Sequence, residues 1–195
     1  GVSGNNDNIK IEINYSLRAH IDQTEHVQAI HPLFTNDFKI HRLSIIEVFA
    51  SKINALMTRA ASRDLYDVYN MIKYNLIKDE SLIHFRKSII LYYVLTTRNE
   101  DKAFNIETID SINERMVKRD LMPVISKRDS FNLEEAQKEV KKYILKILTF
   151  TENEEKFIGF FNNNKFEPSL LFDDTQVLKR IENHPMALWR TRKTI

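Results

Sequence analysis

The chain has 195 residues, of which 43% are hydrophobic and 29% are charged, and it contains no cysteine. This composition is long and apolar enough for one buried core with an appendage, and its mixed charge argues against disorder. The lack of cysteine excludes disulfide scaffolds, thiolate zinc sites and cysteine nucleophiles. The sequence has no run of about 18 apolar residues, so we expect no membrane span. The formal net charge of +2 does not by itself favour nucleic-acid binding.

Glycine is scarce, since the three glycines are Gly1, Gly4 and Gly159. A glycine-rich phosphate loop needs several closely spaced glycines, so this sequence excludes such a loop. The chain starts with Gly1 rather than methionine. We therefore expect a fragment or a processed chain, in which residues 1–8 are a polar lead-in.

The N-terminal third predicts short strands followed by a helix. Residues 9–13 (IKIEI) alternate between apolar and polar side chains, which is typical of a strand with one buried face. Residues 16–37 predict a loop with short strands, and residues 38–43 predict another strand. Ser44 is an expected N-cap, and Glu47 would complete a capping box for a helix that runs to about residue 60.

The pattern of apolar residues predicts helices for the rest of the chain. After a second helix over residues 62–74, helical patterns cover residues 79–98, 105–119, 132–149, 151–163 and 175–183. Prolines 123, 168 and 185 fall between or after them. We expect an α+β fold that is predominantly α, with a soft boundary that divides the chain into residues 1–75 and 76–195.

Two cations occupy unexpected positions on the first of these helices. In helical projection, Lys52 and Arg59 lie inside the apolar sector, two turns apart. The opposite side carries Glu47 and Asn54 among other polar residues, and we expect that side to be solvated. Charged groups in an apolar sector are costly unless they are paired or bind a ligand.

The next helix repeats this arrangement with acids. Asp64 projects between Val68 and Met71, and Asp67 lies at the edge of the same sector. One interpretation is a structural ion-pair network that joins the two helices. The other is an anion site, in which Lys52 and an arginine hold phosphates while carboxylates position a metal or a reacting hydroxyl. The helical pattern alone leaves both interpretations open.

Residues 50–67 also carry a motif, A-x-K-x-x-A-L-x-x-R followed by A-x-R-D-L-Y-D. This motif resembles the AbiEii/AbiGii toxin family of nucleotidyltransferases, within the DNA polymerase β-like superfamily. Residues 9–13 resemble the family strand that bears the third catalytic carboxylate, and residues 168–172 and 183–189 resemble the end of longer members. The chain therefore resembles the C-terminal two thirds of such an enzyme.

The resemblance implies a fold and a chemistry. The fold would be the remnant of a mixed nucleotidyltransferase sheet of two or three strands, followed by a C-terminal helical bundle. Residues 1–75 would be the C-terminal half of the nucleotidyltransferase core, and residues 76–195 a helical domain. The enzyme would use Mg²⁺ to transfer a nucleotide from a nucleoside triphosphate to an acceptor hydroxyl, with release of pyrophosphate.

The resemblance also implies roles for named residues. Glu12 would be a metal ligand or base, and Lys52 would contact the triphosphate. Asp64 or Asp67 would be the late catalytic acid residue, and the sequence does not choose between them. The two remaining cations would pair with phosphate or with those aspartates; they are Arg59 and Arg63.

Two family elements do not occur in the printed sequence: a Gly-Ser turn after residue 4 and an Asp-x-Asp pair. We therefore expect the metal site to be incomplete and this fragment to be inactive. We also expect strand 9–13 to have an exposed edge that pairs with residues 38–43 or with a second copy of the chain.

Three functional hypotheses follow. The first is the nucleotidyltransferase, a cytoplasmic toxin of a toxin–antitoxin or phage-defence system, with an NTP substrate, an RNA or protein acceptor and a cognate antitoxin as partners. The second is a catalytically inert helical interaction module with a structural Lys/Arg–Asp network. The third, nucleic-acid binding by the helical tail, ranks last because the tail lacks a dense basic stripe.

Overall fold

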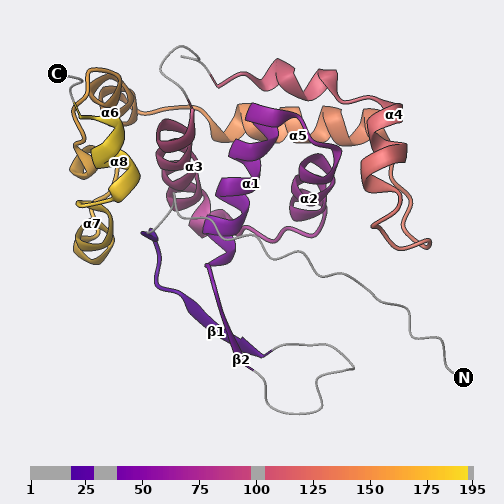
Figure 1. Cartoon of the computed structure of the whole chain (residues 1–195), viewed down its shortest axis with the longest axis horizontal. Helices are drawn as coiled ribbons and strands as arrows, with labels where there is room; N and C mark the ends of the chain where they lie inside the picture. The colour runs from indigo at the N-terminus through magenta and orange to yellow at the C-terminus, as the bar shows by residue number, and fades with distance from the viewer. Residues whose placement is uncertain (1–18, 29–38, 98–103, 193–195) are drawn as a thin grey trace, which may run out of the picture.

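The computed structural model describes residues 19–28, 39–97 and 104–192, which form a helical body and one small sheet (Figure 1). Strand β1 (Glu25–Gln28) pairs antiparallel with β2 (Lys39–Arg42), and Glu25 lies opposite Arg42. These two side chains form an ion pair at 2.7 Å. The ribbon projects away from the helices in Figure 1. This architecture confirms the predicted α+β, predominantly α fold class.

The strand predictions have different outcomes. The strand expected over residues 38–43 is present as β2, and its partner in the sheet is β1, inside the segment expected to hold short strands. The strand expected over residues 9–13, with Glu12, lies outside the described residues.

Helix α1 (Ile45–Arg59) begins at the predicted N-cap, where the Ser44 hydroxyl accepts a hydrogen bond from the Glu47 N–H at 3.1 Å. The helix ends at Ala60, whose left-handed backbone (φ 48°) turns the chain directly into α2 (Ser62–Lys73). A two-residue connection therefore fixes the two motif helices relative to each other.

The later helices largely follow the sequence pattern. They are α3 (Leu82–Thr96), which follows the short 3₁₀ turn η1 (Asp79–Ser81), then η2 (Ile106–Ser111), α4 (Glu114–Met116), η3 (Val117–Leu121), α5 (Leu133–Ile147), α6 (Glu152–Asn162), η4 (Pro168–Leu170), α7 (Thr175–Ile181) and α8 (Pro185–Arg190).

One expectation for these helices was wrong, and one helix was not predicted. Residues 105–119 do not form one helix, because Ile112 and Asn113 are extended and the Asn113 side chain starts a new short helix by accepting from the Met116 N–H. Pro185 follows α7, as expected, and it also opens the unpredicted helix α8. Proline suits a first helical position because its missing N–H would have no intrahelical partner there.

Helix α1 lies at the centre of the body, between α2 and α3, and α5 packs against α2 (Figure 1). Side chains from both motif helices are fully buried, among them Ile53, Leu56, Leu65 and Val68. They belong to one continuous apolar cluster that extends through α3 and α5 to α8. The packing of these apolar faces holds the two motif helices in place.

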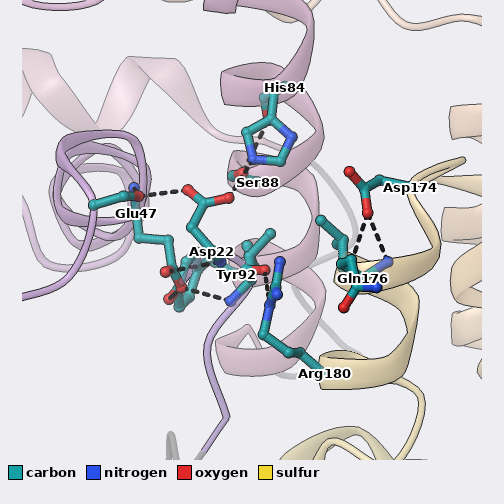
Figure 2. Close-up of polar contacts among 11 residues, drawn as sticks. Asp22, Glu47, His84, Ser88, Tyr92, Asp174, Gln176 and Arg180 are labelled. Carbon is teal, nitrogen blue, oxygen red and sulfur yellow. Dashed lines mark hydrogen bonds and ion pairs between the residues drawn. The ribbon is translucent and has the colours of Figure 1, made fainter. Parts of the chain in front are cut away.

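Glu47 anchors the first described segment of the chain to this body. Its carboxylate accepts hydrogen bonds from the Ile21 N–H at 2.8 Å, the Asp22 N–H at 3.1 Å and the Tyr92 hydroxyl at 2.7 Å (Figure 2). On the other side, the Arg180 Nε donates to the Ile21 carbonyl at 2.8 Å. Glu47 is 0% exposed, so the expectation that it lies on a solvated face was wrong. The same contacts direct its carboxylate away from the N-cap, so only the Ser44 half of the capping box forms.

Asp22 completes this anchor. Its carboxylate accepts from the Ser44 hydroxyl at 2.5 Å and pairs with the His84 Nε2 at 2.7 Å (Figure 2). Burial opposes ionisation of Asp22, but the hydrogen bonds from His84 and Ser44 and the nearby positive charges lower its pKa below the usual value. The start of the described chain is therefore fixed to α1, α3 and α7.

Candidate functional site

The turn between α1 and α2 brings the five predicted charged residues of the motif to one cavity. The cavity has a volume of about 470 Å³, which lies within the range of small-molecule sites. Its charged lining comes from both motif helices: Lys52, Arg59, Arg63, Asp64 and Asp67. Three cations face two carboxylates here, so positive charge is in excess. Glu12, the sixth predicted site residue, lies outside the described residues.

Asp64 is the buried centre of this group, with 0% of its surface exposed. The Arg59 guanidinium binds both of its oxygens, with Nε to Oδ2 at 2.7 Å and a terminal nitrogen to Oδ1 at 2.9 Å. The Lys52 Nζ adds a third contact to Oδ1 at 3.2 Å. This bidentate geometry compensates the cost of burying the carboxylate.

Lys52 joins the two carboxylates, because its Nζ also lies 2.7 Å from the Asp67 Oδ2. Partial burial opposes the charge of Lys52, but the hydrogen bond to Asp67 and the charges of both aspartates raise the pKa of this lysine above its usual value. The hydrogen bonds that Arg59 donates to Asp64 likewise raise the pKa of Arg59. Both cations are therefore charged at neutral pH.

Arg63 differs from these two cations. It lines the cavity and is exposed, and it forms no hydrogen bond or ion pair with the residues that the structure describes. Its charge acts on Asp120, whose pKa is lowered mainly by the hydrogen bond from Arg119 and to a smaller extent by Arg63. Arg63 is thus available to an anionic ligand in the cavity.

An apolar wall of the cavity comes from the end of η3 and the turn that follows it, through Leu121, Val124 and Ile125. Hydrogen bonds from the N–H groups of Val124 and Ile125 to the Leu121 carbonyl, at 2.9 and 3.3 Å, hold this turn. Sequence reasoning missed the wall because no motif marks it.

Two long-range hydrogen bonds hold the segments on either side of the wall against α2. The Ser62 hydroxyl donates to the Met116 carbonyl at 3.3 Å, across 54 positions of the sequence. The Tyr66 hydroxyl donates to the Asp129 Oδ2 at 3.1 Å, and Tyr66 itself lines the cavity. The segments before and after the wall are therefore both tied to α2.

A family model described as "Nucleotidyl transferase AbiEii toxin, Type IV TA system" matches residues 1–157. The chain belongs to the AbiEii family. The match confirms the resemblance that the motif at residues 50–67 indicated, and it supports a nucleotidyltransferase-like toxin. Searches of curated proteins and of solved structures found no match to the chain.

The described residues of this AbiEii chain do not by themselves fit the Mg²⁺ that the family implies. Asp64 and Asp67 are the two carboxylates of the cavity, and cations already hold both. Within the described ranges, no group of three or more histidine, cysteine or acidic side chains is arranged for a metal ion. The predicted ligand Glu12 lies outside these ranges.

A search of the described helices for a membrane span was also negative, since none of them is long and apolar enough to cross a bilayer.

Proposed function

We propose that this AbiEii-family chain carries the phosphate-binding and acidic part of a nucleotidyltransferase site. The reaction would move a nucleotide from a nucleoside triphosphate to an acceptor hydroxyl. The observation that carries this proposal is the shared cavity of Lys52, Arg59, Arg63, Asp64 and Asp67, in which three cations outnumber two carboxylates. A triphosphate is an anion of high charge, and cations in a partly enclosed cavity are suited to bind it.

The residues would divide the work as follows. Lys52 and Arg63 would hold the phosphates, Lys52 as a point charge and Arg63 through its planar fork. Asp64 would position Lys52 and Arg59, because it contacts both from a buried site. Asp67 keeps 39% of its side chain exposed, so it is the carboxylate of the described pair that an acceptor reaches more easily.

The proposed reaction is a single displacement. The acceptor hydroxyl oxygen forms a bond to the α-phosphorus, and the bond from that phosphorus to the oxygen bridging to the β-phosphate breaks. Pyrophosphate leaves with the negative charge of that oxygen, and the hydroxyl proton passes to a carboxylate, for which Asp67 and Glu12 are the candidates. Cations near the phosphates stabilise charge that develops on the leaving oxygen.

Mg²⁺ remains part of the proposal on the family's chemistry, with Glu12 as its proposed ligand. The printed sequence has no Asp-x-Asp pair and no Gly-Ser turn. We therefore propose that the printed chain by itself does not transfer nucleotide, and the activity test below uses the full natural chain.

The test is transfer of labelled nucleotide from each NTP by the full natural chain with Mg²⁺. Lys52→Ala should lower transfer by about 100-fold or more, because it removes a charge aimed at the phosphates. Lys156→Ala is the matched control, since Lys156 pairs with Glu152 on the exposed face of α6. Equal transfer by Lys52→Ala and the unsubstituted protein would contradict the role of Lys52.

The buried position and three contacts of Asp64 also favour a second candidate, an inert interaction module in which the charges are structural. A double-mutant cycle on Lys52 and Asp64 separates the two candidates. Large losses of folding stability from either single change, with nucleotide binding absent from the unsubstituted protein, would favour the structural candidate. Nucleotide binding that is present in the unsubstituted protein and lost in a folded Lys52→Ala variant would favour the enzyme.

The biological setting is proposed from the printed family description, a toxin of a type IV toxin–antitoxin system. We propose a cytoplasmic toxin active in phage defence, with an RNA or protein acceptor and a cognate antitoxin. Pairing of a second copy along a strand edge is a further proposal. Induced expression of the full natural chain should arrest growth, and co-expression of the neighbouring reading frame should restore it. Unimpaired growth would count against the toxin.

A further inference from the structure

The cavity has two chemically different sides, and the proposed function uses only the charged one. The other side, Leu121, Val124 and Ile125, carries no polar side-chain atom. Val124 is 62% exposed, although a branched aliphatic side chain is normally buried. Val124 therefore presents an open apolar surface in the same cavity as the phosphate-binding cations.

A nucleoside triphosphate has the same two-sided character. Its phosphates are anionic, and its base is a flat ring whose faces make favourable apolar and stacking contacts. Tyr66 lines the cavity from α2 and has both an apolar ring and a polar hydroxyl. The hydroxyl already donates a hydrogen bond to Asp129. The Tyr66 ring also packs against Phe131 in a T-shaped arrangement, with the ring centroids 5.7 Å apart, and the ring surface that lines the cavity is the part of Tyr66 that a base would contact.

We propose that Val124, with Leu121, Ile125 and the ring of Tyr66, receives the base of the nucleoside triphosphate whose phosphates are held by Lys52 and Arg63. This inference rests on the proposed function and adds a base subsite to it. The backbone hydrogen bonds of the Leu121–Ile125 turn hold the wall in shape before a ligand arrives. Such preorganisation lowers the entropic cost of binding.

The experiment compares two probes by calorimetry with the full natural chain. One probe is inorganic tripolyphosphate, and the other is the tightest-binding ribonucleoside triphosphate, made non-hydrolysable between the α- and β-phosphates. Val124→Ser should weaken binding of the nucleotide about five-fold and leave tripolyphosphate unchanged, because the wall contacts only the base. Arg63→Gln should weaken binding of both probes.

Met122→Ser is the matched control. Met122 belongs to the same turn and is 48% exposed, but it does not line the cavity, so nucleotide affinity should not change. Circular dichroism checks that each variant is folded.

The outcomes separate the two levels of the proposal. Unchanged nucleotide affinity in Val124→Ser, or an equal loss for both probes, would overturn the base subsite and leave the phosphate site standing. A higher KM for the acceptor with unchanged nucleotide affinity would also overturn it, since the wall would then contact the acceptor. Failure of the unsubstituted protein to bind either probe would overturn the proposed function as well.

Discussion

Asp64 and Asp67 lie one helical turn apart on α2, yet their surroundings differ sharply. Asp64 is buried and holds Arg59 and Lys52, whereas Asp67 keeps 39% of its side chain exposed and, among the described residues, forms an ion pair with Lys52 alone. Removal of one partner from a buried ion pair leaves a polar group without compensation, while an exposed pair contributes little. The two aspartates should therefore differ in their effect on stability.

Asp64→Asn should lower the free energy of unfolding by about 2–3 kcal/mol, because the amide cannot accept all three cationic contacts. The matched substitution Asp67→Asn should cost less than about 1 kcal/mol. Urea unfolding at neutral pH measures both. Equal losses of unfolding free energy in the two variants would mean that burial does not determine how much Asp64 contributes to stability.

Glu47 illustrates a limit of sequence reasoning at this scale. Its place in the helical projection predicts solvent, but its carboxylate accepts from two backbone N–H groups more than 20 positions earlier and from Tyr92 on α3. The pKa of the Tyr92 hydroxyl is raised, mainly because Tyr92 is buried and also because the Glu47 carboxylate beside it is negatively charged. A periodicity within one helix contains no information about such distant partners.

Glu47→Gln should lower the free energy of unfolding by about 2–3 kcal/mol, because one side of the amide donates and leaves a buried donor without a hydrogen bond. Glu134→Gln, on the exposed face of α5, should change it by less than about 0.5 kcal/mol. Chemical unfolding of both variants measures the difference. A cost for Glu47→Gln as small as that of the control would contradict the anchoring role.

At the element scale, α8 combines a cap with a titratable group. His184 is buried and its Nδ1 accepts a hydrogen bond from the Met186 N–H at 3.2 Å, which caps the helix. Burial is the main cause of a lowered pKa for His184. Since the folded state resists protonation of this ring, the cap depends on a neutral histidine.

Stability should therefore fall as pH decreases below about 6.5, where the unfolded chain takes up a proton that the folded chain does not. His184→Asn keeps a favourable capping residue and should remove this part of the pH dependence. His184→Ala should also remove it, with an additional loss of about 1 kcal/mol at every pH. Thermal unfolding between pH 7.5 and 5 measures the slopes, and an unchanged slope in both variants would contradict the role of His184.

The elements with a strong local signal were predictable, and those that depend on distant partners were not. Ser44 marks the start of α1 through its own hydroxyl, and α2, α5 and α6 have apolar faces of helical period. Helix α3 is instead buried on nearly all sides, and its long apolar run is the signal that predicts it. Residues 105–119 carry a similar pattern, but the Asn113 cap interrupts it, because an asparagine side chain competes for backbone hydrogen bonds.

The same distinction applies to the site. The five charged residues lie within sixteen consecutive positions on two adjoining helices: Lys52, Arg59, Arg63, Asp64 and Asp67. Helical periodicity predicts the face of each helix that carries them, and the short connection between α1 and α2 brings the two faces to one cavity. Val124 and its neighbours reach the cavity only through tertiary packing of η3 against α2. The sequence predicts the same role for Arg59 and Arg63, so only the structure shows that Arg63 is the cation that remains available to a ligand.

For the whole molecule, the predicted boundary near residue 76 can be tested by dissection. Apolar side chains of α1 and α2 belong to the same buried cluster as those of α3 and α5. Residues 76–195 expressed alone should therefore lack a cooperative unfolding transition, because the faces that α1 and α2 cover would be exposed. The intact chain should unfold in one transition. Cooperative unfolding of the fragment would instead support an independent helical domain.

The two sides of the cavity come from segments that are remote in sequence and meet through few polar contacts, such as that between Ser62 and Met116. The charged side is constrained by its mutual ion pairs, so a change in one member affects the others. The apolar side carries no such coupling, and Val124 is exposed. Substitutions can accumulate at Val124 while the charged side and the buried Leu121 stay constant, which makes position 124 the natural place to diversify or redesign what the protein accepts.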